Sequence, residues 1–212
     1  MRQLPFATPA AVESALDEVV THLRAGGLIA YPTETVYGFG GLVRDDALAA
    51  LSALKSRDES KPFLILVRRA GDVQGVQWTP AARKLAERFW PGALSIALCV
   101  DRDMPTRILS EEGTVALRAT PHEGIRRLLE RLGEPITSTS ANLPRSAPAT
   151  SAEDVAHVLR EMEREDVMIL DGGQLPPSAS STLVDCSVDP PRVLREGAIT
   201  TDALLQIVDL NG

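Results

Sequence analysis

Hydrophobic residues along the chain follow two alternating patterns, which predict interleaved helices and strands. A helix is expected from Pro9 to the Gly26-Gly27 pair, because Thr8 can cap it and apolar residues recur every three to four positions. The same spacing predicts helices at residues 45–54, 80–90, 121–132 and 151–162, and from about residue 200. Short apolar runs predict strands at residues 28–31, 63–67, 94–100, 115–119, 136–140, 167–170, 182–184 and 193–195.

This interleaving predicts an α/β fold, in which helices cover a mixed sheet. Several of the strands are apolar throughout, as expected when both faces of a sheet are covered. No repeat, low-complexity tract or linker interrupts the pattern, so we expect residues 1–212 to form a single domain. Residues 172–181 are rich in Gly, Pro and Ser and are expected to form a surface loop.

Charge and composition narrow the classes of partner. The chain has 29 acidic and 22 basic residues, a net charge of −7, and 4% aromatic residues. An acidic chain is not a bulk electrostatic binder of nucleic acid, so any anion site must be a local basic pocket inside an acidic shell. The two cysteines exclude a disulfide framework, and the three scattered histidines give no reason to expect a zinc site.

The chain shows no membrane-spanning or targeting pattern. Its longest apolar stretch, residues 89–100, is too short for a span and contains Pro91 and Gly92. The N-terminal apolar run is broken by Pro5 and Pro9 and resembles no signal peptide. We therefore expect a cytoplasmic protein with no membrane partner and with reduced thiols.

Two polar stretches are candidates for binding an anion, although each has a purely structural alternative. Thr33, Glu34 and Thr35 precede a glycine-rich segment, either an anion-binding turn or a turn whose hydroxyls are satisfied locally. Further along, three cations fall within seven residues, at Lys55, Arg57 and Lys61. They suit a polyphosphate, or they are the cations usual at a helix C-terminus.

Three later stretches are equally ambiguous. Arg118 lies in an apolar strand, where it requires a ligand carboxylate, bound bidentately, or an internal acidic residue. Ser138 and Ser140 share one face of a strand rich in hydroxyls. In the tail, Arg195 alone indicates only a solvated edge residue. The usual signatures of phosphate-binding loops and nucleophilic serines are absent from the chain.

Taken in order, these segments resemble the YrdC family, the L-threonylcarbamoyladenylate synthases. The resemblance covers nearly the whole chain and rests on residues 26–38, 55–57, 61–62, 89–92, 115–118, 138–142, 170–173, 181–185 and 194–199. It implies a twisted mixed sheet covered by helices around a large basic cavity. It also implies a nucleotidyltransferase that converts L-threonine, bicarbonate and ATP, with accompanying Mg²⁺, to L-threonylcarbamoyladenylate and pyrophosphate.

The product would supply the threonylcarbamoyl group for adenosine 37 of tRNA, through transient contact with a transfer complex or with tRNA. In this reaction the carbamate formed from threonine and bicarbonate attacks the α-phosphorus of ATP. Such an enzyme needs no catalytic histidine, because its task is to position anions and stabilise phosphate charge. The alternative is an RNA-binding module of the same fold, which the net charge and scarce aromatic residues oppose.

The resemblance also assigns roles by position. The residues expected to contact threonine are Thr35, Arg118, Ser138 and Ser181. Those expected to contact ATP are Arg57, Lys61, Thr114, Ser140, Asn142 and Arg195. Lys55 and Arg57 are the expected catalytic residues, and no protein side chain is expected to bind metal. The chain departs from the family at Leu66, where many members have a histidine, and at Pro148, where many have a serine.

Overall fold

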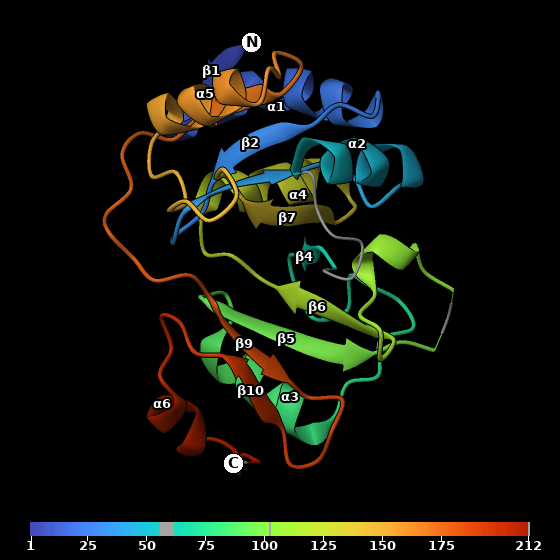
Figure 1. Ribbon diagram of the computed structural model, residues 1–212. Coiled ribbons are helices and arrows are strands. Elements are labelled where there is room, and N and C mark those ends of the chain that lie inside the picture. Colours follow the sequence, from blue (N-terminus) through green and yellow to red (C-terminus); the bar gives the residue numbers. More distant parts are fainter. Residues whose placement is uncertain (56–61, 102, 212) are drawn as a thin grey trace.

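A strongly twisted mixed sheet organises the computed structural model, which describes residues 1–55, 62–101 and 103–211 (Figure 1). Its strands are β1 (Gln3–Pro5), β2 (Ile29–Pro32), β3 (Tyr37–Gly40), β4 (Leu64–Leu66), β5 (Leu94–Cys99), β6 (Thr114–Arg118), β7 (Ile136–Ser140), β8 (Met168–Asp171), β9 (Thr182–Asp185) and β10 (Arg192–Arg195). Their spatial order is β1-β8-β2-β3-β7-β4-β6-β5-β9-β10, with both parallel and antiparallel pairs. The expected mixed α/β fold is therefore confirmed.

The helices are α1 (Pro9–Arg24), α2 (Asp45–Lys55), α3 (Pro80–Phe89), α4 (Glu123–Leu132), α5 (Ala152–Glu161) and α6 (Thr201–Leu205), with a 3₁₀ turn at Thr106–Ile108. Their ends follow local chemistry. The hydroxyls of Thr8 and Thr79 accept hydrogen bonds from the first turns of α1 and α3, and Ser151 forms a capping box with Asp154. Helix α4 starts later than expected, because His122 caps it.

Three apolar clusters join the helices to the sheet. Leu16, Val19 and Leu23 of α1 pack with Ile125 and Leu128 of α4 against the β1-β8-β2 end of the sheet. Residues of α2 and α5 pack over the opposite face of the same region. A third cluster joins α3 and α6 to β5 and β9, at the lower end of the molecule in Figure 1. The helices thus brace both ends of a curved sheet.

Strand β3 replaces the expected glycine-rich turn. Residues 37–40 are buried, pair with β2 on one side and with β7 on the other, and offer no anion-binding loop. A Cβ atom on Gly40 would lie 1.9 Å from the carbonyl oxygen of Thr137 in β7. The glycine therefore permits a close approach of two strands, and interpreting it as part of a turn was wrong.

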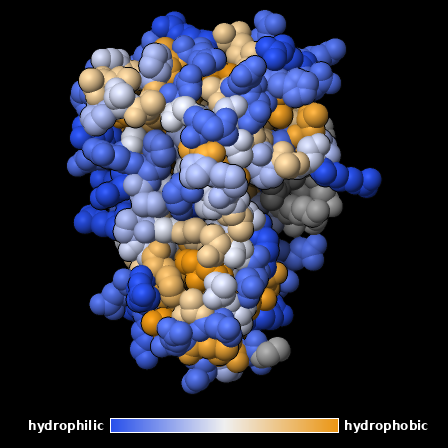
Figure 2. All heavy atoms as spheres, turned by 90° about the vertical axis from the view of Figure 1, so that its left-hand side faces the viewer, coloured by the Kyte–Doolittle hydropathy of each residue, from blue (hydrophilic) through white to orange (hydrophobic). Residues whose placement is uncertain are grey.

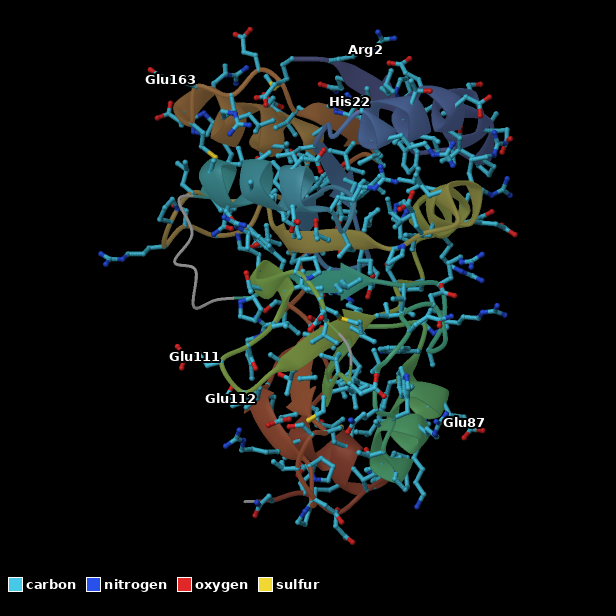
Figure 3. The ribbon with its side chains drawn as sticks, turned by 90° about the vertical axis from the view of Figure 1, so that its right-hand side faces the viewer. Arg2, His22, Glu87, Glu111, Glu112 and Glu163 are labelled. Carbon is cyan, nitrogen blue, oxygen red and sulfur yellow. The ribbon has the colours of Figure 1, made fainter. Side chains whose placement is uncertain are left out.

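The surface carries the acidic charge. Glu87, Glu111 and Glu163 project outward at the periphery of the molecule (Figure 3). Figure 2 shows another face that is mostly hydrophilic, with hydrophobic side chains gathered mainly in its lower half. Within the described parts of the chain, no helix combines the length and apolar character needed to cross a bilayer.

Candidate functional site

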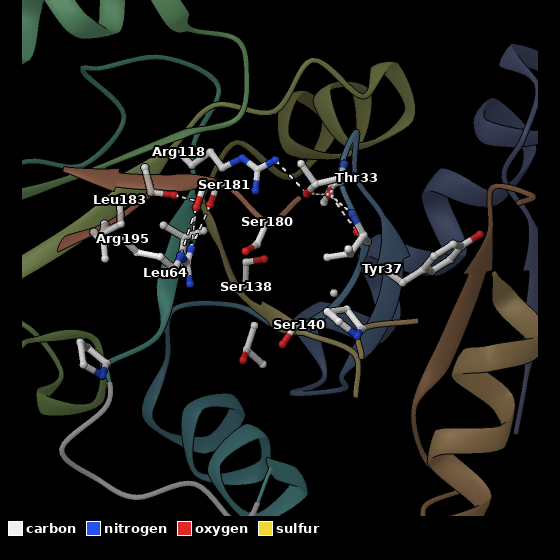
Figure 4. A pocket seen from close by; sticks show the side chains of 18 residues that line it. Thr33, Tyr37, Leu64, Arg118, Ser138, Ser140, Ser180, Ser181, Leu183 and Arg195 are labelled. Carbon is white, nitrogen blue, oxygen red and sulfur yellow. Dashed lines mark hydrogen bonds between the residues drawn. The ribbon is translucent and has the colours of Figure 1, made fainter. Parts of the chain in front are cut away.

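A pocket of about 430 Å³ lies on one face of the sheet (Figure 4). Its lining residues come from every strand in the row β3-β7-β4-β6-β5-β9-β10, together with the turn at residues 33–36 and the segment at 180–181. Each of these strands contributes one to three of the lining residues. Residues from 33 to 195 must therefore be folded together to assemble this surface.

The pocket lining is rich in hydroxyls and basic. It contains the guanidinium groups of Arg118 and Arg195 and, among the described residues, no carboxylate. The described pocket lining is therefore positively charged within a chain whose net charge is −7. The volume falls within the ~300–1,000 Å³ usual for small-molecule sites. The arrangement suits an anionic ligand with several hydrogen-bonding groups.

Thr33 shapes the turn that enters the pocket between β2 and β3. Its hydroxyl donates to the carbonyl of Val36 at 2.8 Å and accepts from the backbone N–H groups of Thr35 and Val36. Since that proton is committed to Val36, the hydroxyl of Thr35, 3.0 Å away, donates to Thr33. The hydroxyls are thus satisfied locally, the structural alternative left open by the sequence.

Arg118 is held by three protein groups. Nη2 donates to a carboxylate oxygen of Glu34 and to the hydroxyl of Thr35 at 3.2 Å, and Nε donates to the carbonyl of Gly92 at 3.3 Å. The other carboxylate oxygen of Glu34 accepts from Thr120 at 2.6 Å. The internal acid that Arg118 required is therefore Glu34. A bidentate contact to a ligand is ruled out while these bonds hold, because both forks of the guanidinium need a hydrogen of Nη2 and both of its hydrogens are engaged.

Arg195 has no carboxylate partner in the described parts of the chain. Its Nε and Nη2 atoms donate to the carbonyl of Ser181, at 3.2 and 2.8 Å. Partial burial, and secondly the positive charge of Arg118, lowers the pKa of Arg195 from its usual range. The hydroxyl of Ser181 lies 2.9 Å from that of Ser95, a buried pocket residue that the sequence did not single out. This side of the pocket therefore holds an uncompensated positive charge.

The predicted site residues as a whole divide into three groups. Thr35, Arg118, Ser138, Ser140, Ser181 and Arg195 all line the one pocket. Lys55, Thr114 and Asn142 are not among its lining residues. Arg57 and Lys61 lie outside the described residues, so their roles stay predictions.

Lys55 joins the end of α2 to the end of β7. Its ammonium donates to the carbonyls of Ser140 and Asn142, at 3.0 and 2.7 Å, and to the side-chain oxygen of Asn142 at 3.0 Å. The hydroxyl of Ser140 also donates to that side-chain oxygen, at 2.6 Å. These contacts stiffen the strand end that presents Ser140 to the pocket. The catalytic role expected of Lys55 stays a prediction.

The two departures from the family pattern occupy different places. Leu66 is fully buried in β4 and packs in the apolar cluster with α1 and α4. Pro148 lines the pocket. A histidine contact to the ligand is therefore not available at residue 66, whereas residue 148 contributes only apolar surface.

The environments of two other titratable groups, His122 and Cys186, indicate structural roles. Burial lowers the pKa of His122, whose ring stacks on Phe6 while Nδ1 caps α4. Burial raises the pKa of the Cys186 thiol to about 12, which opposes nucleophilic use. Residues 1–55, 62–101 and 103–211 contain no group of three or more His, Cys, Asp or Glu side chains able to hold a metal ion.

Comparison with known proteins agrees with this architecture. Residues 21–197 match the family model Sua5_yciO_yrdC, described as telomere recombination. A threonylcarbamoyl-AMP synthase of Bacillus subtilis is 33% identical over 191 residues, covering 88% of this chain and 54% of the relative. The chain thus spans about half the length of that relative. A threonylcarbamoyl-AMP synthase of Thiobacillus denitrificans is 35% identical, covering 82% of this chain and 92% of the relative.

Among solved structures, P. abyssi Sua5 complexed with L-threonine superposes with a TM-score of 0.86 at 28% identity. The match covers 99% of this chain and 62% of that one. The family model accounts for most of the chain, and the superposition extends over nearly all of its fold. The chain belongs to the Sua5/YciO/YrdC family.

Proposed function

We propose that this protein synthesises L-threonylcarbamoyladenylate from L-threonine, bicarbonate and ATP, with release of pyrophosphate. The observation that carries the proposal is the pocket itself, which joins two arginines and a row of hydroxyls on the fold of a family with threonylcarbamoyl-AMP synthases. The product would supply the threonylcarbamoyl group for tRNA modification.

The reaction depends on positioning the substrates more than on acid–base catalysis. The amine of threonine combines with bicarbonate to a carbamate and water, and a carbamate oxygen then attacks the α-phosphorus of ATP. The bond from that phosphorus to the bridging oxygen breaks, and pyrophosphate leaves. Arg118 is proposed to bind the threonine carboxylate, and Thr35, Ser138 and Ser181 to surround the rest of the amino acid.

Arg195 and Ser140 are proposed to bind the nucleotide at the other side of the pocket, together with Arg57, Lys61, Thr114 and Asn142. Arg195 suits this role because no protein carboxylate competes for it in the described parts of the chain. Since the described pocket lining has no carboxylate, Mg²⁺ is proposed to enter with the triphosphate of ATP, where it would offset phosphate charge.

Pyrophosphate release by the pure protein tests the proposal directly. Release from ATP is expected to require both bicarbonate and L-threonine, and the adenylate product is expected to be detected by mass spectrometry. A site that hydrogen-bonds a hydroxyl rejects an analogue lacking it, so valine should be a poor substrate and serine an intermediate one. Equal release with valine and threonine would contradict the assignment of the amino-acid side of the pocket.

Replacing Arg195 by alanine tests the nucleotide side. We expect the KM for ATP to rise at least about tenfold, because a charge-assisted contact contributes about 1.5–3 kcal/mol. The KM for threonine should change by less than about threefold, and stability by no more than about 1 kcal/mol, because within the described residues the Arg195 side chain hydrogen-bonds to Ser181 alone.

Arg192→Ala is the matched control for that variant. Arg192 lies in the same strand β10 but pairs with Asp185 and does not line the pocket. Its loss should leave the KM for ATP unchanged. If both variants raise this KM equally, Arg195 has no specific role in binding the nucleotide.

A further inference from the structure

Glu34 is a charged residue in contact with Arg118, on the amino-acid side of the pocket, and no predicted role accounts for it. It lies outside the pocket lining and contacts Arg118 from the turn at residues 33–36. The Glu34 side chain is 22% exposed and that of Arg118 is 6% exposed, so their ion pair is largely withdrawn from water. Such a pair has to be compensated by further hydrogen bonds.

Those further bonds come from two other parts of the chain, residues 119–122 and Gly92. Thr120 donates to Glu34 and also accepts from the backbone N–H of His122, at the start of α4. On the other side, the carbonyl of Gly92 accepts from Arg118. The backbone N–H of Gly92 donates to the carbonyl of Ala119 at 2.7 Å, which holds this acceptor beside β6. Glu34 is thus one member of a network that fixes the guanidinium plane.

This network leaves part of the Arg118 guanidinium available to a ligand. A guanidinium has five N–H groups. For Arg118, the Nε–H points to Gly92 and the two hydrogens of Nη2 point to Glu34 and Thr35. Among the described residues, nothing accepts from Nη1. The two hydrogens of Nη1 are therefore the ones available in the pocket.

Charge leads to the same division. Arg118 and Arg195 line one pocket and their positive charges repel each other. Glu34 neutralises Arg118, while Arg195 has only neutral partners in the described chain. The pocket is therefore near neutral on the Arg118 side and positive on the Arg195 side. A zwitterionic amino acid suits the first side, and a polyphosphate suits the second.

We propose that Glu34 is a positioning residue for amino-acid recognition. It orients Arg118 so that Nη1 alone binds the substrate carboxylate. It also neutralises the charge of Arg118, so that the nucleotide is attracted to Arg195. This inference rests on the proposed function. It implies that the loss of Glu34 weakens the binding of threonine more than the binding of ATP.

Steady-state kinetics of Glu34→Gln test the inference, because glutamine keeps the shape and removes the charge. We expect the KM for L-threonine to rise at least about tenfold, while the KM for ATP and kcat at saturating threonine stay within about threefold. Glu134→Gln is the matched control, because Glu134 pairs with Arg44 on the surface and should leave all three constants unchanged. An unchanged KM for threonine, or equal rises in both KM values, would overturn the proposal.

Two further measurements keep the test decisive. If Glu34→Gln does not fold, Thr120→Val replaces it: a rise of about threefold or more confined to the KM for threonine supports the proposal, and no change overturns it. If the wild-type protein releases no pyrophosphate, the proposed function fails. NMR then tests whether Glu34 positions the Arg118 side chain. The Nε–Hε signal of Arg118 should be sharp in the wild type and exchange-broadened in Glu34→Gln; identical signals would overturn the role.

Discussion

Alanine at position 118 is expected to lower kcat/KM for L-threonine about a hundredfold and to destabilise the fold. The activity loss follows from removing a charge-assisted contact of about 1.5–3 kcal/mol to the substrate carboxylate. The stability loss follows because Glu34 keeps its carboxylate in a largely buried position without its cationic partner, which costs about 3 kcal/mol. Steady-state kinetics and urea unfolding measure the two effects separately.

A double variant separates binding from folding. Arg118→Met combined with Glu34→Gln removes both charges and fills the space with an apolar side chain. Its stability should return to within about 1 kcal/mol of the wild type, since no unpaired charge is left in the largely buried position. Its activity should stay low. A single Arg118→Ala variant as stable as the wild type would show that Glu34 does not depend on Arg118.

The other large effect is expected from Gly40→Ala, a change that adds one methyl group. The added Cβ would lie 1.9 Å from the carbonyl oxygen of Thr137, and both atoms belong to paired or buried backbone that cannot move independently. Overpacking of this kind should destabilise the protein by about 3 kcal/mol or more. Because β3 and β7 carry five pocket residues between them, activity should fall with it.

Gly71→Ala is the control for that experiment. Nothing lies within 4 Å of the position that a Cβ on Gly71 would take, and Gly71 is exposed. Urea unfolding should therefore give nearly the wild-type free energy for this variant. If Gly40→Ala is equally well tolerated, the close approach of β3 and β7 is not a constraint on the fold.

Helices were predicted well because their signals are local. Thr8, Thr79 and Ser151 lie next to the backbone groups that they cap, and Gly133 follows the last residue of α4. All eight strands predicted from apolar runs also agree with the structure within two residues at either end. The sequence did not predict strand β1, which has three residues and whose partner β8 lies some 160 residues further along the chain.

The failures concern contacts between distant segments. Tyr37-Gly-Phe-Gly40 has the composition of a turn, and the carbonyl of Thr137 on a distant strand explains why residue 40 of this buried strand is glycine. The sequence likewise showed that Arg118 needs a partner but not which one, because Glu34 precedes it by 84 residues. The roles of Thr120 and Gly92 depend on that same pairing. No local signal could have revealed them.

The spatial order of the strands has a consequence for how the protein is made. Strand β3 emerges from the ribosome long before β7, its neighbour, and the pocket lacks Arg195 until β10 has followed. Folding is therefore dominated by non-local pairing, which is slow and leaves strand edges exposed for longer. A nascent chain that stops short of residue 195 would carry most of the sheet yet lack Arg195, the arginine of the described pocket lining that no carboxylate neutralises.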